Sequence, residues 1–232
     1  MEKQKYAAIV LAAGSGKRMN SQVHKQYLII QDRPVLYYSL KAFEDSAVDE
    51  IVLVVGKGEE EFCRREIVDK YGISKVKAIV EGGKERYHSV FEGLKQTSDA
   101  DYVLIHDGAR PFVNQDIIRR CMQEVQKYQA CVVGMPVKDT IKIADEEGYA
   151  KQTPDRKNVW MIQTPQTFSY ALIYEAYEEM LKTEDTAITD DAMVLERIKG
   201  KKSKLIEGSY RNIKITTPED LLIANVYLQH PE

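Results

Sequence analysis

A glycine-rich turn with cations close behind it is the part of this chain whose residue types best suit chemistry. The segment Ala12-Ala13-Gly14-Ser15-Gly16-Lys17-Arg18-Met19 directly follows a short apolar run, Tyr6 to Leu11, that indicates a buried strand. Glycines and small residues let the backbone turn tightly and bring its N–H groups close to a ligand. Lys17, Arg18 and the nearby Lys25 add positive charge. This combination predicts a site for phosphate groups.

The order of residues in this turn excludes two common phosphate motifs. A P-loop requires Gly-x-x-x-x-Gly-Lys-Ser/Thr, which the segment does not contain. A dinucleotide-binding turn requires a third glycine at the position of Met19. The simplest alternative is a strand-to-helix turn with solvated basic side chains, but the cations crowded behind the turn favour phosphate binding.

Two further segments follow predicted strands. Gly82 and Gly83 come after the apolar run Val76 to Val80, where their bare backbone lets a flat base lie close, and Ser89 can add a hydroxyl from the next helix. In isolation such a glycine pair more often marks only the entry to a helix. Asp107 comes directly after the run Tyr102 to His106, at the sheet edge where open α/β sheets bind ligands. A carboxylate there suits Mg²⁺ bridging triphosphate oxygens, although an aspartate after a strand is often only a turn former.

Short apolar runs alternate with helix-like segments along the chain. This pattern predicts an α/β fold with a mostly parallel sheet and helices on both of its faces. The last helix is expected to begin at Pro218 with Thr217 as its N-cap. The expected strands are Ile51 to Val55, Val76 to Val80, Tyr102 to Ile105 and Cys131 to Met135, and the expected helices are Glu59 to Lys70, Glu85 to Gln96 and Asp116 to Tyr128.

One polar stretch, residues 137–159, breaks this alternation. Lys138 to Ile143 alternates polar and apolar residues, which predicts a strand pair outside the main sheet, and Glu147-Gly148 suits its turn. By composition alone a surface loop is a competing interpretation. Lys214 is unusual too, because it interrupts the apolar run Ile213 to Ile215. It is predicted to reach an anion from a strand end; the alternative is an edge-strand lysine.

Eight segments, in order along nearly the whole chain, resemble the nucleotidyltransferases that join a nucleotide to a sugar or polyol phosphate. Within that group they resemble the 2-C-methyl-D-erythritol 4-phosphate cytidylyltransferase family. The segments are Ala12 to Met19, Lys25-Gln26-Tyr27, Gly82-Gly83-Lys84-Glu85-Arg86, His106-Asp107-Gly108-Ala109-Arg110-Pro111, Pro136-Val137-Lys138-Asp139-Thr140, Gln163-Thr164-Pro165-Gln166, Thr189-Asp190-Asp191-Ala192 and Asn212-Ile213-Lys214-Ile215-Thr216.

The resemblance implies a fold and a reaction. The fold is a Rossmann-like nucleotidyltransferase domain over residues 1–232, with residues 137–159 as an arm that crosses to the second subunit of a homodimer. The reaction joins CTP to 2-C-methyl-D-erythritol 4-phosphate, giving 4-diphosphocytidyl-2-C-methyl-D-erythritol and pyrophosphate, with Mg²⁺ as cofactor. The attacking phosphate has a second pKa of about 6 and is mostly a dianion at neutral pH, so it needs no general base. The site must instead supply cations, oriented N–H groups and a metal.

The resemblance also implies a role for individual residues. Arg18 and Lys25 are expected to stabilise the transition state. The nucleotide is expected to contact Ala12, Ala13, Gly14, Gly16, Gly83, Lys84, Ser89 and Asp107, the last of which also holds the metal. The polyol phosphate is expected to contact Arg110, Thr140, Arg156, Thr164, Thr189 and Lys214, with Thr140 acting across the dimer. This chain differs from the family pattern at His24, where many relatives carry proline, and at Lys84, where some carry aspartate.

Two rival functions are a ribitol 5-phosphate cytidylyltransferase and a nucleotide-binding regulatory protein without catalysis. Three features favour a methylerythritol phosphate enzyme over a ribitol phosphate enzyme: Gly108-Ala109, Asp155-Arg156 and Trp160. The intact Arg18, Lys25 and Asp107 argue against the second. Because Lys25 lies in the matched segment Lys25-Gln26-Tyr27, the alternative of a mere surface lysine is the weaker interpretation.

Composition limits the partners and the compartment. The net charge of −3 argues against general binding of nucleic acid. No apolar run is long enough to span a membrane, so we expect no membrane-spanning segment. Cys63, Cys121 and Cys131 form no CxxC and have no metal-ligand spacing, so we expect reduced thiols in a cytoplasmic protein.

Overall fold

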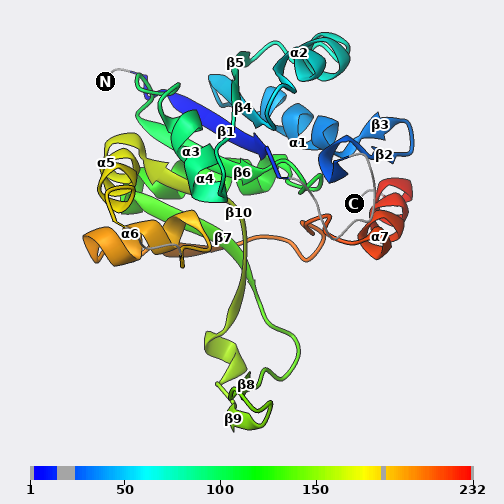
Figure 1. Cartoon of the computed structure of the whole chain (residues 1–232). Coiled ribbons are helices and arrows are strands. Elements are labelled where there is room, and N and C mark those ends of the chain that lie inside the picture. The colour runs from blue at the N-terminus through cyan, green and yellow to red at the C-terminus, as the bar shows by residue number, and fades with distance from the viewer. Residues whose placement is uncertain (1–2, 15–23, 184–186, 231–232) are drawn as a thin grey trace.

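A seven-stranded sheet forms the centre of the molecule in the computed structural model, which describes residues 3–14, 24–183 and 187–230 (Figure 1). The strands lie in the order β11-β7-β10-β6-β1-β4-β5. β10 runs antiparallel to both of its neighbours, and the other neighbouring pairs are parallel. The strands are β1 (Tyr6–Ala12), β4 (Glu50–Val55), β5 (Val76–Glu81), β6 (Tyr102–Asp107), β7 (Ala130–Pro136), β10 (Trp160–Ser169) and β11 (Lys204–Glu207).

Helices cover both faces of this sheet, which is why its central strands are apolar almost throughout. On β1, Ala8 and Val10 belong to one core with α1 and α4, whereas Ala7 and Ile9 belong to a second core with α3, α5 and α6. The mostly parallel α/β sheet predicted from the sequence is thus confirmed. The helices are α1 (Val35–Glu44), α2 (Glu60–Cys63), α3 (Arg86–Leu94), α4 (Gln115–Tyr128), α5 (Tyr170–Met180), α6 (Asp191–Lys199) and α7 (Pro218–Gln229).

The order of the strands creates a crevice at the carboxyl end of β1. From β1 the chain adds β4 and then β5 on one side, through α1 and α2. It then returns through α3 to place β6 on the other side of β1. In open α/β sheets ligands bind at such a reversal, outside the carboxyl ends of the strands. The turn after β1, the loop after β5 and the end of β6 therefore face one place.

Local signals in the sequence predicted several elements correctly, one element incompletely and one wrongly. The last helix does begin at Pro218, and Thr217 forms a capping box with Asp220. The helix expected over Glu59 to Lys70 is divided into α2 and a following π-helix, η3 (Arg64–Asp69). The strand expected around Lys214 is wrong, because residues 212–216 form no strand. Instead the Ile215 N–H donates to the Ala109 carbonyl at 2.8 Å, which lays this segment beside the turn after β6.

Residues 137–159 form an arm that projects from the end of the sheet, away from the body of the molecule (Figure 1). At its tip β8 (Ile143–Ala144) pairs antiparallel with β9 (Ala150–Gln152). Gly148, at φ 89°, lies in the turn, and the Asp145 carboxylate accepts hydrogen bonds from the turn's N–H groups. The hairpin outside the main sheet is confirmed, although its first strand begins at Ile143 and not at Lys138. A short 3-10 helix, η4 (Arg156–Asn158), leads back to β10.

None of the helices in the described parts of the chain is long and apolar enough to cross a membrane. The three cysteines are buried and free. Further hairpin strands, β2 (Ile29–Ile30) and β3 (Arg33–Pro34), pack with α7 in a small separate core.

His106 is a fully buried histidine on β6, beside the end of the strand. Its Nε2 lies 3.2 Å from the Arg110 carbonyl, which can only accept, so Nε2 carries the proton. Its Nδ1 lies 3.0 Å from Thr164 Oγ1 and accepts the hydroxyl proton, while Thr164 Oγ1 accepts the Asp107 N–H at 3.1 Å. Burial lowers the pKa of His106 to about 4. The neutral ring therefore has a structural role and connects the Arg110 carbonyl to Thr164.

This histidine should make the protein sensitive to mild acid. Its unfolded pKa is about 6.5, so between about pH 6.5 and pH 4 the unfolded chain binds a proton that the folded chain does not. Stability is thus present above pH 6.5 and is lost as the pH falls. We expect His106→Gln to remove about 2 kcal/mol of the loss in unfolding free energy between pH 7 and pH 4.5. Urea unfolding of the wild type and the variant at pH 7 and at pH 4.5 measures this difference. An identical loss of unfolding free energy in both proteins would contradict the lowered pKa of His106.

Candidate active site

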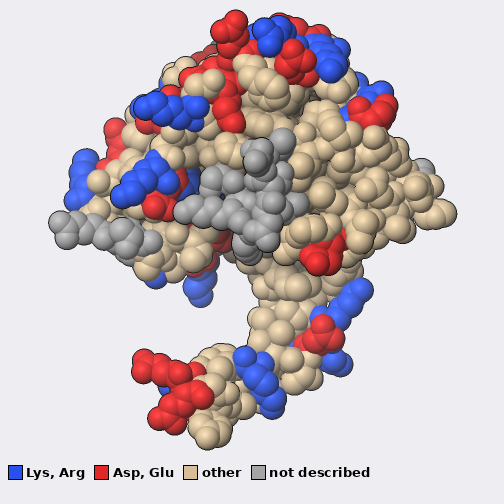
Figure 2. Space-filling view, turned by 45° about the vertical axis from the view of Figure 1, so that its right-hand side comes forward, with Lys and Arg blue, Asp and Glu red and all other residues tan. Residues whose placement is uncertain are grey.

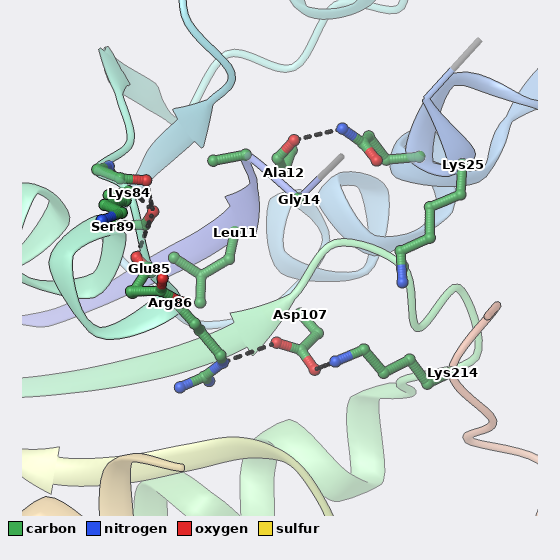
Figure 3. A pocket seen from close by; sticks show the side chains of 14 residues that line it. Leu11, Ala12, Gly14, Lys25, Lys84, Glu85, Arg86, Ser89, Asp107 and Lys214 are labelled. Carbon is green, nitrogen blue, oxygen red and sulfur yellow. Dashed lines mark hydrogen bonds and ion pairs between the residues drawn. The ribbon is translucent and has the colours of Figure 1, made fainter. Parts of the chain in front are cut away.

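A cavity of about 370 Å³ opens at the carboxyl ends of β1 and β6 (Figure 3). It is bounded by the turn after β1, the loop after β5, the end of β6 and the segment before α7. Its lining residues are Leu11, Ala12, Ala13, Gly14, Lys25, Gln26, Gly83, Lys84, Glu85, Arg86, Ser89, Asp107, Ala109 and Lys214.

The first wall is the end of β1 with the 3-10 turn η2 (Lys25–Tyr27) beside it. The buried Gln26 side chain donates to the Ala12 carbonyl, which fastens the turn to the strand (Figure 3). From this turn the Lys25 side chain extends toward the part of the cavity that holds Asp107 and Lys214 (Figure 3). Lys25 thus joins Ala12, Ala13 and Gly14 in one cavity, as expected, whereas Gly16 and Arg18 lie outside the described residues.

The second wall is the loop from Gly82 to Glu85, which lies directly against the end of β1. A Cβ at Gly82 would stand 2.5 Å from the Ala13 Cβ and 2.7 Å from Ser89 Oγ, so only glycine permits this approach. Ser89 Oγ accepts the Gly83 N–H at 3.1 Å and thereby holds the loop to α3. Lys84 is exposed at the rim. The expected nucleotide residues Gly83, Lys84 and Ser89 do line the cavity.

Asp107 forms the floor, buried among three cations. Its Oδ2 lies 2.7 Å from Lys214 Nζ and 4.0 Å from Arg110 Nε, and its Oδ1 lies 3.4 Å from Arg86 Nε. Burial alone would raise the pKa of Asp107, but Arg86, Lys214 and Arg110 outweigh it and hold that pKa well below its usual range. The carboxylate is therefore ionised at any physiological pH.

Arg86 is the functional residue that residue-by-residue interpretation of the sequence missed. Its guanidinium forms a bidentate pair with Asp191, at 2.7 and 2.8 Å, and the Tyr177 hydroxyl donates to the same carboxylate at 2.6 Å. Asp191 has no exposed surface. Burial would lower the pKa of Arg86, but Asp191 and Asp107 raise it above its ordinary value. A charged Arg86 thus joins the starts of α3 and α6 to the end of β6.

Gln166 holds the start of α6 from the neighbouring strand β10. Its Oε1 accepts the N–H groups of Asp191 and Ala192, at 3.0 and 2.9 Å, and its Nε2 donates to Asp190 at 3.0 Å. Asp190 also accepts the Met193 N–H and so caps α6. Asp191, by contrast, points inward to Arg86. Gln166 lies in one of the matched segments, but no local pattern marks its role.

Other predicted substrate residues lie behind or beside the cavity. Arg110 donates to the Asn212 carbonyl at 2.7 Å and is only 12% exposed at its side chain. Thr164 is occupied between Asp107 and His106. Thr189 is exposed at the start of α6, with its hydroxyl 3.5 Å from Met193 Sδ. Their roles toward a substrate stay predictions.

Two predicted substrate residues lie on the arm and outside this cavity. Thr140 and Arg156 are both exposed, and Arg156 donates to the Lys138 carbonyl at 3.1 Å. Neither lines the cavity of its own chain. Figure 2 shows the arm standing clear of the body, with acidic side chains gathered at its tip. If these residues act on a substrate held in such a cavity, a second chain must supply the cavity.

The described residues fit a magnesium ion only together with a nucleotide. Within residues 3–14, 24–183 and 187–230, no group of three or more His, Cys, Asp or Glu side chains is arranged to hold a metal. Asp107 supplies the carboxylate on the cavity floor. Mg²⁺ is commonly bound by one or two carboxylates, substrate phosphates and water. A triphosphate in the cavity would supply the missing oxygens.

The charge of the lining suits a polyanion. Four cationic side chains, of Lys25, Lys84, Arg86 and Lys214, face two anionic ones, of Glu85 and Asp107. No histidine or cysteine lines the cavity, so the described groups offer positive charge and N–H donors in place of a nucleophile or a general base. Such an arrangement stabilises charge that develops on phosphate oxygens during transfer.

Comparison with known proteins agrees with this geometry. The family model described as "IspD: 2-C-methyl-D-erythritol 4-phosphate cytidylyltransferase" matches residues 6–230. Relatives named 2-C-methyl-D-erythritol 4-phosphate cytidylyltransferase include one from Lachnospira eligens, 54% identical over 96% of this chain and 98% of its own length. Another, from Lachnoclostridium phytofermentans, is 50% identical over 97% of each chain.

Solved structures show the same architecture. The 4-diphosphocytidyl-2C-methyl-D-erythritol synthase from Anaerococcus prevotii matches with a TM-score of 0.86 and 38% identity, over 98% of this chain and 97% of that one. The 2-C-methyl-D-erythritol 4-phosphate cytidylyltransferase from Thermus thermophilus matches with a TM-score of 0.77 and 30% identity, over 95% and 98%. These matches favour neither a ribitol phosphate enzyme nor a regulatory protein. Motifs, cavity and near end-to-end likeness lead to one conclusion: the chain belongs to the 2-C-methyl-D-erythritol 4-phosphate cytidylyltransferase family.

Proposed function

We propose that this chain transfers the cytidylyl group of CTP to 2-C-methyl-D-erythritol 4-phosphate and releases pyrophosphate, and that the cavity at the end of β1 is where it does so. The observation that carries this is the ionised Asp107 on the cavity floor, surrounded by cations and faced by the glycine loop. We propose that the base binds at the loop and that the triphosphate binds at the charged floor. The family to which the chain belongs supports the same reaction.

The residues act by holding charge and not by moving protons. The acceptor phosphate is already a dianion, with a second pKa of about 6, so the barrier comes from repulsion between polyanions and charge around the α-phosphorus. Lys25 lies where it can meet that charge, and Arg18 is proposed to share this role. A magnesium ion, held by Asp107 and triphosphate oxygens, would neutralise further charge. Ala12, Ala13, Gly14, Gly83, Lys84 and Ser89 are proposed to hold the nucleotide, with Gly16 beside them.

The acceptor is proposed to bind at the Lys214 side of the cavity. Lys214 would exchange part of its contact with Asp107 for the acceptor phosphate, and Arg110, Thr164 and Thr189 would orient it from the same end of the sheet. The active unit is proposed to be a homodimer, in which Thr140 and Arg156 of one arm reach the partner's cavity. The apolar side chains of Ile143 and Tyr149, 46% and 70% exposed on the arm, support contact with another chain.

The compartment is proposed to be the cytoplasm. Three buried free thiols fit a reducing environment, in which structural disulfides do not persist.

A panel of substrates tests the reaction itself. Each of the four nucleoside triphosphates is incubated with methylerythritol phosphate or with ribitol 5-phosphate, and pyrophosphate release is measured. We expect turnover with CTP and methylerythritol phosphate, and at least about tenfold less with UTP, because one missing buried hydrogen bond costs about 1–3 kcal/mol. Equal turnover of ribitol 5-phosphate would assign the chain to the rival substrate. Absence of pyrophosphate with every pair would contradict an enzymatic function.

The glycine loop should be essential for holding the base. Gly82→Ala places a methyl group against the Ala13 Cβ and Ser89 Oγ, so the loop must move away from β1. We expect kcat/KM for CTP to fall by about 10-fold or more, equivalent to about 1.4 kcal/mol, with little change in KM for the acceptor. Steady-state kinetics with each substrate varied in turn measure this. An unchanged KM for CTP in a folded variant, checked by its Tm, would show that the base binds elsewhere.

Mixed dimers test whether the arm serves the partner's site. Lys25→Ala and Arg156→Ala proteins should each be nearly inactive, and Lys157→Ala, a neighbouring exposed change on the arm, should stay active. When the two inactive proteins are unfolded and refolded together, about half of the dimers are mixed and one of their two sites is intact. About a quarter of wild-type activity should therefore return. A mixture that contains mixed dimers yet stays inactive would show that Arg156 serves its own chain.

A further inference from the structure

Glu59, in the connection between β4 and α2, contacts the turn that carries Lys25. Its Oε2 accepts a hydrogen bond from the Tyr27 hydroxyl at 2.7 Å and another from the Gly56 N–H at 3.0 Å. Its Oε1 lies 2.7 Å from His24 Nδ1, an ion-pair contact when the imidazole is protonated. One carboxylate thus contacts the residue before Lys25 and the residue two positions after it.

The 3-10 turn between those contacts is short and is held at a third point. The Tyr27 N–H donates to the His24 carbonyl at 2.9 Å, so the two residues that Glu59 contacts also close the turn. Gln26 donates to the Ala12 carbonyl on the cavity side. Lys25 has the only cationic side chain in the turn Lys25–Tyr27 and extends from it into the cavity (Figure 3). Movement of this backbone would therefore move the Lys25 ammonium relative to the floor.

The contact is built and is not a chance surface pair. Glu59 is 20% exposed at its side chain, and a Cβ at Gly56 would stand 2.6 Å from its Oε2, so glycine is what lets the carboxylate approach the strand end. Burial raises the pKa of Tyr27 well above its ordinary value, so the hydroxyl keeps its proton and donates. Two further residues enclose the Tyr27 side chain. Cys63 Sγ lies 3.1 Å from its hydroxyl, and the Phe62 ring packs against its ring in an edge-on arrangement.

We propose that Glu59 is a positioning residue for Lys25: it fixes the turn on both sides of the lysine and so sets where the ammonium stands in the cavity. The inference rests on the proposed function, in which Lys25 stabilises charge in the transition state. His24 gives this chain a second contact to the same carboxylate. Glu59 itself lies outside the residues that line the cavity.

The test compares Glu59→Ala with Glu61→Ala, which removes the same charge from an exposed position one step into α2. We expect Glu59→Ala to lower kcat by about 10- to 100-fold, since a shift of about 1 Å in a positioned group has effects of that order. KM for CTP should change by less than about threefold, because the base loop is untouched. Glu59→Gln keeps one acceptor oxygen and should lose less. Glu61→Ala should match the wild type.

The Lys25→Ala background shows whether the effect passes through the lysine. Once Lys25 is gone there is nothing to position, so adding Glu59→Ala should lower kcat by less than about twofold. The same 10- to 100-fold loss in both backgrounds, or a Glu59→Ala protein as active as Glu61→Ala, would overturn the inference. If Lys25→Ala alone keeps full kcat, the proposed role of Lys25 fails first, and that outcome is separately visible.

A variant with a milder change guards against misfolding. Tyr27→Phe removes one hydrogen bond to Glu59 and leaves the ring in place. Its Tm is compared with that of the wild type to show that it folds. With Lys25 present, we expect Tyr27→Phe to lower kcat by about 3- to 10-fold. In the Lys25→Ala background, adding Tyr27→Phe should leave kcat unchanged. If Glu59→Ala does not fold, this pair of measurements decides the question: an unchanged kcat in folded Tyr27→Phe overturns the inference.

Discussion

The guanidinium of Arg86 joins two buried carboxylates, and the geometry of the active site depends on that contact. It forms a bidentate pair with Asp191 and approaches Asp107 with its remaining nitrogen. A buried carboxylate without a partner is costly, commonly by several kcal/mol. Arg86 is the cation that pairs with the buried Asp191, and it shares the stabilisation of Asp107 with Lys214 and Arg110. The starts of α3 and α6 and the end of β6 are thereby fixed relative to one another. The glycine loop ends where α3 begins, so its position relative to β6 is fixed by the same contact.

The same contact explains how a cavity for a polyanion can have an acid on its floor. Asp107 stays ionised because Arg86, Lys214 and Arg110 outweigh the effect of its burial. In the proposed function the ionised carboxylate would hold a divalent ion without first losing a proton, and the fixed cations around it would contact the phosphate oxygens. His106 lies behind Asp107 and is kept neutral by burial, so it adds no positive charge to the cavity floor. The proposed site would therefore act by electrostatic preorganisation.

The two halves of the proposed site differ in how they are assembled. The residues proposed for the nucleotide lie in one cavity of one chain, on the turn after β1, the loop after β5 and the end of β6. Several residues proposed for the acceptor lie elsewhere: Thr140 and Arg156 stand on the arm, and Arg110 points toward backbone carbonyls. Such a division would make nucleotide binding a property of each chain and completion of the acceptor site a property of the dimer.

The sequence by itself determined the parts that depend on local chemistry. Most strands of the sheet, the glycine turns at their ends, the position of Asp107 and the hairpin arm follow from neighbouring residues, because parallel strands bring their carboxyl ends to one edge. The role expected of Lys25 came from its match to a family segment. Tertiary structure alone decided the rest. Arg86 and Asp191 are 105 residues apart, and Glu59 is 32 residues from Tyr27, so only the folded sheet brings them within hydrogen-bond distance. Lys214 reached Asp107 from a loop and not from the expected strand, since the segment is held by the turn at Ala109. Such pairs leave no periodic signal, because their members are far apart in the sequence and attract each other strongly only once folding has buried them side by side.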